Sequence, residues 1–100
     1  MEAIGAGAGG ERLPPPAIPQ GMTLHAFGHR VMRWGTGSEA ARARIATLTR
    51  AELVHAGVTG DMAVAWRDFY LHELVRNPLN PSAAGRAELM QRAIELLSGD

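Results

Sequence analysis

Residues 59–78, TGDMAVAWRDFYLHELVRNP, decide the class of fold because this stretch carries both end signals and the apolar spacing of a long helix. Thr59 is a suitable N-cap, and Asp61 places a negative charge beside the positive end of the helix dipole. Pro78 disfavours helical geometry in the residue before it, so the helix should end near Asn77. Large apolar side chains recur at helical spacing and should form the inner face: Met62, Trp66, Phe69 and Tyr70.

The residues after this stretch predict a second long helix. Asn80 is the expected N-cap and Pro81 the first helical residue, because the φ angle fixed by the proline ring suits that position. The helix should end at Ser98 and Gly99. Its apolar stripe repeats at spacings of four and three residues: Ala83, Ala87, Met90, Ile94 and Leu97.

Three shorter helices are predicted before this stretch. The first should run from a Thr23 cap to about Trp34 and stop at Gly35, with Leu24 on its apolar stripe and another helix crossing closely at Gly28. The other two should begin at capping-box sequences, in which a hydroxyl residue precedes a glutamate by three positions: Thr36–Glu39 and Thr49–Glu52.

The composition also favours an all-α fold. Seventeen Ala and ten Leu stand against nine Val plus Ile, and Ala and Leu form helices more readily than strands. Residues 1–21 contain five Gly and four Pro and lack apolar periodicity, so we predict a disordered tail there. Residues 22–100 are predicted to form one domain, a compact orthogonal bundle of about five helices.

Several classes of protein are excluded by what the chain lacks. Without cysteine it has no disulfide and no thiolate zinc site. No apolar run approaches the roughly 18 residues that cross a bilayer, and the N-terminus lacks the basic and apolar regions of a cleaved signal peptide. We therefore expect a cytoplasmic protein without a membrane span.

The net charge is zero, but the charges are unevenly distributed. Residues 1–21 carry one Arg and two acids for −1, residues 22–50 carry five Arg and one Glu for +4, and residues 51–100 carry four Arg and seven acids for −3. Such asymmetry either steers a partner or lets the two halves of the fold attract each other, and we favour attraction within the fold. If the positive block is instead a docking surface, its partner should be acidic.

Two pairs of residues with i, i+4 spacing are candidates for chemistry: His25 with His29, and Asp68 with His72. The histidine pair could hold a metal ion. A set of four ligands would also need Asp68 and His72, so the helix of the histidine pair and the helix of the second pair would have to cross at the same depth. In the second pair Asp68 could orient His72 as a general base. Both motifs are incomplete, because Ala26 stands where a zinc-protease helix has glutamate and no activated nucleophile is apparent. We therefore assign no catalytic residue, no metal and no cofactor.

The segment from Thr49 to Trp66 has the outline of a helix-turn-helix. The details fit poorly, because Leu53 occupies a position that is usually small and a neutral chain lacks the electrostatic footprint of a DNA-binding protein. Nucleic acid is therefore not the expected partner. Four arginines are the candidate binding residues, whether for nucleic acid or for an acidic protein: Arg42, Arg44, Arg50 and Arg67.

Three runs of the sequence are distinctive: residues 24–37, which begin LHAF and end WGTG, residues 58–70, which begin VT and end WRDFY, and NPLNPSAAGR at residues 77–86. Together they resemble an uncharacterised family of small all-α bacterial domains associated with effector and polymorphic-toxin proteins. The resemblance spans residues 22–97 and implies bacterial origin and a link to secretion or interbacterial competition. It assigns no catalytic residue and no ligand, and it does not distinguish a toxin from an adaptor or an immunity partner.

The sequence thus favours a non-enzymatic protein-interaction domain, a module of a bacterial secreted effector system, over two alternatives. One alternative is a small toxin enzyme that uses His25, His29, Asp68 or His72, and the other is a helix-turn-helix DNA-binding regulator. The expected partner is another protein, acidic by preference, or a second copy of the chain. The expected location is the bacterial cytoplasm, with export by a specialised system that leaves no cleaved signal peptide.

Overall fold

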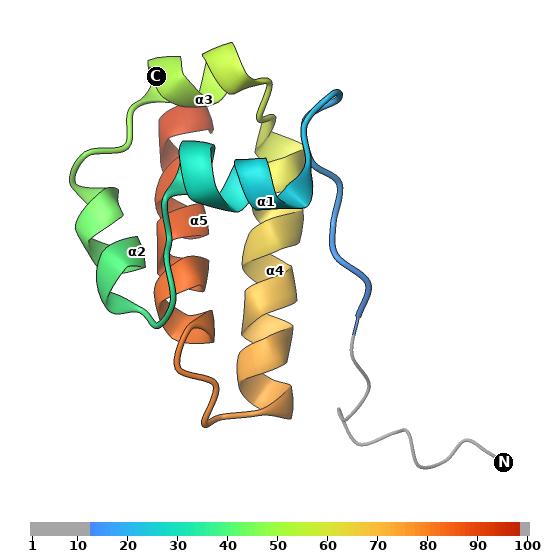
Figure 1. The fold of residues 1–100 in the computed structure, drawn as a ribbon, viewed down its shortest axis with the longest axis vertical. Helices are drawn as coiled ribbons and strands as arrows, with labels where there is room; N and C mark the ends of the chain where they lie inside the picture. The colour runs from blue at the N-terminus through green and yellow to red at the C-terminus, as the bar shows by residue number, and fades with distance from the viewer. Residues whose placement is uncertain (1–12, 99–100) are drawn as a thin grey trace, which may run out of the picture.

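The computed structural model describes residues 13–98, and over that range it consists of helices joined by loops and turns (Figure 1). The helical elements are α1 (Leu24–Ala26), η1 (Phe27–Met32), α2 (Glu39–Ile45), α3 (Arg50–Ala56), α4 (Gly60–Arg76) and α5 (Ala83–Ser98). Element η1 is a π-helix that continues α1 without a break, so the described residues form five helices in space, and the predicted all-α fold is confirmed. Within this range no helix is both long and apolar enough to span a membrane.

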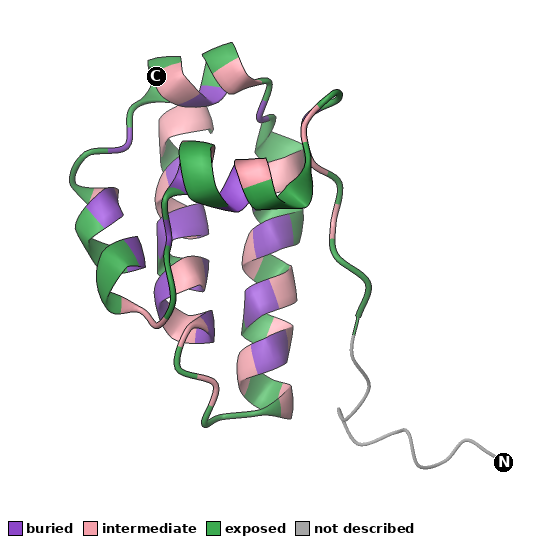
Figure 2. Ribbon diagram, viewed as in Figure 1, coloured by how far each residue is buried: buried purple, intermediate pink, exposed green. Residues whose placement is uncertain are grey.

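Helices α4 and α5 form the frame of the fold. They lie side by side and run in opposite directions, while α1 and η1 cross one end of the pair (Figure 1). Helices α2 and α3 pack against α5. The faces that the helices turn toward one another are buried, and their outer faces are exposed (Figure 2). Small residues on α5 bring little side-chain volume to these contacts and let the neighbouring elements approach closely: Ala83, Gly85, Ala87 and Ala93.

Three helices start where the local signals predict. The side-chain oxygens of Thr23, Thr49 and Thr59 accept backbone N–H groups at the starts of α1, α3 and α4. Thr49 and Glu52 complete the predicted capping box, because the Glu52 carboxylate accepts the Thr49 backbone N–H at 3.0 Å. These starts depend on contacts within one helical turn, which is why the sequence alone predicts them.

The start of α5 differs from its prediction by two residues. Asn80 does cap the residues that lead into α5, because its Oδ1 accepts the backbone N–H groups of Ser82 at 2.9 Å and Ala83 at 3.2 Å. Pro81 lies in a turn ahead of the helix, and its carbonyl accepts a hydrogen bond from the Ser38 hydroxyl. The helix therefore begins at Ala83 and not at Pro81.

The capping box predicted at Thr36–Glu39 is wrong. Helix α2 begins after Ser38, whose side chain makes no capping hydrogen bond to it. The Ser38 hydroxyl instead donates to the Pro81 carbonyl at 2.8 Å and accepts the Gly85 backbone N–H at 2.9 Å. A Cβ atom on Gly85 would come within 2.5 Å of the Ser38 Cβ, so this close contact requires glycine. A contact between distant segments thus replaces the local cap.

The first helix ends earlier than predicted. It stops at Met32, and Arg33 takes a left-handed conformation with φ of 53°. Trp34 therefore lies beyond the helix, and its indole rests against Gly28, where an added Cβ would be 2.6 Å from the indole nitrogen. The close approach at Gly28 is made by this ring, so the predicted crossing helix was wrong. Leu24, which was predicted to face inward, is exposed.

Arg44 is buried, although it was a candidate for contact with a partner. Its side chain is 5% exposed and forms an ion pair with Glu52 at 3.2 Å. Its guanidinium also donates to the Val31 carbonyl at 2.9 Å and to the Thr47 hydroxyl at 3.0 Å. Arg44 thereby ties α2 to the end of η1 and to the first turn of α3.

Two ion pairs join the positive and the acidic parts of the chain. Arg44 pairs with Glu52, and Arg42 of α2 pairs with Glu88 of α5 at 2.9 Å. The Arg42 guanidinium lowers the pKa of Glu88, first by its hydrogen bond to the carboxylate and then by its charge. Both pairs are attractions between these two parts of the chain within the fold, which is the alternative that the sequence analysis favoured.

Part of the predicted tail lies against the domain. Residues 1–12 lie outside the described residues. The N-terminal segment, residues 13–22, contains no helix, and its Ala17 carbonyl accepts a hydrogen bond from the Trp66 indole Nε1 at 2.9 Å. Pro19 is buried. The composition of this segment did not predict these contacts.

Replacing Arg44 by alanine should strongly destabilise the fold. The change leaves the Val31 carbonyl and the partly exposed Glu52 carboxylate without their partner, and removal of one partner from such part-buried hydrogen bonds lowers the free energy of unfolding by about 1 to 3 kcal/mol. Arg42→Ala is the matched control on the same helix, because its ion pair is half exposed and should contribute little. Chemical denaturation followed by circular dichroism compares the two. Equal losses of stability would contradict the buried role of Arg44.

Candidate functional site

All five aromatic side chains of the protein meet between η1, the loop that follows it, and α4. Phe27 packs edge-on against Trp34, with 5.7 Å between the ring centroids. Trp34 stands nearly perpendicular to Tyr70 at 5.4 Å, and Phe69 packs edge-on against Trp66 at 5.5 Å. Such edge-to-face contacts favour fixed ring orientations, so the cluster forms a rigid apolar surface.

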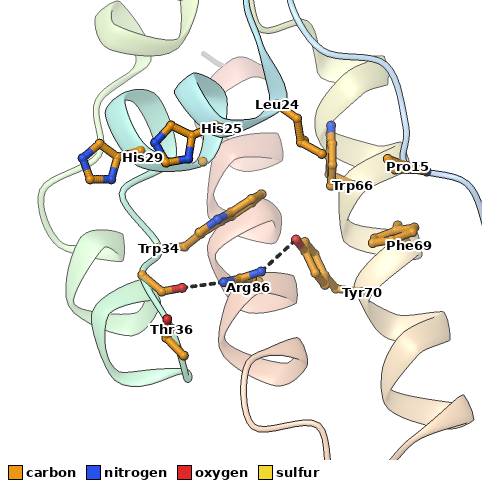
Figure 3. Close-up of a pocket in the computed structure, with 12 residues that line it drawn as sticks. Pro15, Leu24, His25, His29, Trp34, Thr36, Trp66, Phe69, Tyr70 and Arg86 are labelled. Carbon is orange, nitrogen blue, oxygen red and sulfur yellow. Dashed lines mark hydrogen bonds between the residues drawn. The ribbon is translucent and has the colours of Figure 1, made fainter.

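Arg86 reaches this cluster from α5. Its guanidinium carbon lies 4.9 Å from the centroid of the Trp34 ring and 5.5 Å from that of Tyr70. Nη1 donates to the Tyr70 hydroxyl at 3.2 Å, and Nη2 donates to the Gly35 carbonyl (Figure 3). The Nε atom is buried and has no hydrogen-bond partner in the described structure. No carboxylate among residues 13–98 forms an ion pair with this guanidinium.

Arg86 and all of these aromatic side chains except the fully buried Phe27 line a cavity of about 380 Å³, a size within the usual range of ligand sites (Figure 3). The aromatic rings and Pro15 form its apolar walls. The lining residues able to carry charge are Arg86, His25 and His29, and none of the lining residues is acidic. The cavity therefore suits a ligand that combines an anionic group with an apolar one.

Two backbone features place Trp34 in the cavity wall. Arg33 and Gly35, on either side of it, both have left-handed φ angles, 53° and 58°, and so turn the chain back toward η1. Gly28 leaves room for the indole, because a Cβ there would clash with the indole nitrogen. The position of this wall therefore depends on the loop conformation and on the missing side chain of Gly28.

The hydroxyl of Tyr70 stays protonated in this environment. Burial raises the pKa of Tyr70 above its ordinary value, and the charge and hydrogen bond of Arg86 oppose that rise. Because burial dominates, the neutral phenol remains at physiological pH and accepts the hydrogen bond from the guanidinium. Tyr70 thus positions Arg86.

The predicted His and Asp pairs lie in different places. His25 and His29 line the cavity, with their rings stacked at a centroid distance of 5.2 Å. Asp68 and His72 are not among the lining residues, and Asp68 forms an ion pair with Arg67 at 2.9 Å. In the described part of the chain no three His, Cys, Asp or Glu residues lie close enough to share a metal ion. The structure thus places the histidine pair in the cavity wall and leaves Asp68 and His72 outside it.

The four arginines predicted as binding residues are spread over three helices. Arg42 and Arg44 on α2 form the ion pairs described above, and Arg50 is exposed at the start of α3. Arg67 on α4 donates to the Gln91 side chain at 2.9 Å. None of the four lines the cavity, and the buried Arg44 is not available to a partner.

Arg86 was missed as a site residue by the sequence analysis. It lies three positions after Ala83, at the edge of the stripe predicted to face the core, and a charged residue at such a position requires partners inside the fold. That spacing is the signal that could have identified it. Its partners Trp34 and Tyr70 come from distant segments, so the sequence did not reveal them.

The fold and the cavity define a small helical domain with an aromatic site, and comparisons with known proteins place it in a family. Residues 7–97 match the family described as Domain of unknown function (DUF4951), so the chain belongs to this uncharacterised family. The chain is also similar to a protein from Acinetobacter baumannii whose structure was determined by NMR. The two are 39% identical, the match covers 86% of this chain and 83% of that chain, and the TM-score is 0.72. Among curated proteins none matches the sequence.

The protein has a single tyrosine, so the ionisation of Tyr70 can be followed by ultraviolet absorbance. We expect a midpoint above the ordinary value of 10.0 in the folded protein, because burial favours the neutral phenol. A raised pKa stabilises the fold below the pKa of the unfolded chain, and this contribution is lost as pH rises through the folded pKa. The urea-denatured chain is the control and should titrate at the ordinary value. A folded midpoint equal to that of the denatured chain would contradict the buried position of Tyr70.

Proposed function

We propose that the domain is a non-enzymatic protein-interaction module that binds an acidic partner and holds a carboxylate of that partner at Arg86. The observation that carries the proposal is the charge of the cavity. Arg86, His25 and His29 line it, and no lining residue is acidic. A carboxylate that enters would therefore meet nitrogen donors and no group of like charge.

The neighbours of Arg86 prepare it for this role. Stacking on Trp34 and Tyr70, together with the hydrogen bonds to Tyr70 and Gly35, restricts the motion of the guanidinium before any ligand arrives. A guanidinium that is already ordered loses little entropy when it binds a planar carboxylate. Each terminal nitrogen carries two N–H groups and donates one of them within the protein, so donors remain for a ligand.

The apolar walls add selectivity for a peptide over a free anion. Phe69 is half-buried, lies across the cavity from the histidines, and can bury an apolar side chain next to the bound carboxylate (Figure 3). An acidic residue beside an aromatic or aliphatic one matches both features of the cavity. The proposed ligand is thus a short acidic and apolar segment of another protein.

The biological setting belongs to the same proposal. The bacterial source of the similar Acinetobacter protein supports a bacterial setting. The sequence resemblance supports a role as a module of a secreted effector system, acting from the bacterial cytoplasm and exported without a cleaved signal peptide. A second copy of the chain is the alternative partner.

The proposal can be tested with two blocked peptides, one containing Ala-Phe-Glu-Ala and the other Ala-Phe-Gln-Ala. We expect the glutamate peptide to shift the Trp34 indole signal in NMR titrations, and the glutamine peptide to bind more weakly because it lacks the charge. Arg86→Gln should weaken binding of the glutamate peptide by about tenfold or more, since hydrogen bonds to charged groups contribute about 1.5 to 3 kcal/mol. Added salt should also weaken it.

Arg92→Gln is the matched control, because it removes another arginine from α5 that pairs with Glu95 on the surface. This variant should bind the glutamate peptide as wild type does. Circular dichroism melts establish that both variants are folded. Equal affinity for the two peptides, or an unchanged affinity in a folded Arg86→Gln variant, would contradict the proposal.

A further inference from the structure

The N-terminal segment covers part of the aromatic wall on α4. The Ala17 carbonyl accepts the indole N–H of Trp66 at 2.9 Å. Pro15 lines the cavity together with Trp66 and Phe69 (Figure 3). A piece of the chain that precedes every helix thus lies against Trp66 and beside Phe69, the ring that would receive an apolar ligand group.

Further contacts anchor the end of this segment that leads into α1. Pro19 is buried, and Ile18 packs against the core. The Pro19 carbonyl also accepts the Met22 backbone N–H at 3.2 Å, which closes a turn. In the proline run Pro14–Pro16, in contrast, Pro15 lines the cavity beside the aromatic wall, and Pro14 and Pro15 are exposed.

The chemistry of this contact is that of proline recognition. A proline ring fixes φ and removes the backbone N–H, so a proline-rich segment is already extended and leaves its carbonyls available to outside donors. Aromatic grooves bind such segments at a low entropy cost, with ring faces against the prolines. Trp66 supplies both a ring and a donor, Phe69 supplies a second ring, and residues 14–19, PPPAIP, supply the prolines.

We infer that the surface formed by Trp66 and Phe69 is a recognition site for proline-rich segments. Residues 14–19 occupy it within the same chain, and a proline-rich segment of another protein competes with them for it. The seated segment itself identifies the chemistry of the occupant. The site shares the ring of Phe69 with the apolar wall of the proposed function but does not use the guanidinium of Arg86, so the inference does not rest on binding of an anion.

Competition within the chain determines how strongly a partner binds. A tethered segment acts at an effective concentration of about the millimolar range, so a free peptide of equal intrinsic affinity should bind the wild type weakly. Weakening the contacts of the tethered segment should raise the apparent affinity for the peptide. The N-terminal segment would then set the threshold for binding of a proline-rich partner.

The test uses the full chain and a blocked peptide LPPPAIPQ, the sequence of residues 13–20. A triple variant, Pro14→Ser with Pro15→Ser and Pro16→Ser, weakens the tethered segment and leaves its anchored end unchanged. Hydrogen exchange of the Trp66 indole N–H, followed by NMR, should be about two- to tenfold faster in this variant, as expected for loss of one hydrogen bond. Added peptide should restore the protection and should bind the variant more tightly than the wild type.

Two further changes show which atoms bind the peptide. In the triple variant, Trp66→Phe removes the indole donor but keeps a ring, and should weaken peptide binding about two- to tenfold. Leu71→Ala, at an exposed position of the same helix, is the matched control and should leave the affinity unchanged. A peptide with serine in place of every proline should not bind.

Failure of the peptide to bind the folded triple variant would overturn the inference. Rapid exchange of the Trp66 indole N–H in the wild type would also overturn it, and this measurement does not depend on the folding of any variant. A wild-type dimer that dissociates when the peptide is added would show that the segment of a second copy occupies the site. That result would overturn occupation of the site within one chain. None of these results depends on the glutamate peptide, so the two proposals can fail separately.

Discussion

The guanidinium of Arg86 joins three parts of the chain that are distant in the sequence. Helix α5 supplies the guanidinium, α4 supplies the ring and hydroxyl of Tyr70, and the loop after η1 supplies Trp34 and the carbonyl of Gly35. Each contact is modest in free energy, but together they position a loop that contains two left-handed residues. The cavity owes its shape to this loop, and so the site depends on one arginine.

The state of this arginine also connects the fold to the proposed function. Its Nε atom, like that of Arg44, is buried without a hydrogen-bond partner in the described structure. Unlike Arg44, however, Arg86 forms no ion pair with a described carboxylate. A cation that contributed only to stability would be expected to pair with a carboxylate, as Arg44 pairs with Glu52. Departures of this kind from full pairing are concentrated at functional sites. The contrast between the two arginines therefore favours Arg86 as the residue that meets a ligand.

How far the sequence predicts this structure depends on how local each interaction is. Thr49 and Thr59 cap their helices as predicted, because a cap needs only the next few residues. The capping box at Thr36–Glu39 was wrong and the burial of Arg44 was not predicted, because Ser38 and Arg44 find their partners in other elements. The site itself followed the same rule. The sequence predicts Trp66, Phe69 and Tyr70 on one face of a helix, whereas Arg86 acquires its role only when α4, α5 and the loop meet.

A double-mutant cycle on the free energy of unfolding tests most directly whether Arg86 organises the site. Arg86→Gln, Tyr70→Phe and the double variant would be compared with the wild type by chemical denaturation. If the guanidinium and the Tyr70 hydroxyl hold each other in place, the two changes should not be additive, and the coupling energy should be about 1 kcal/mol or more. Additive losses would show that the two groups do not interact in solution, and would contradict the central role of Arg86.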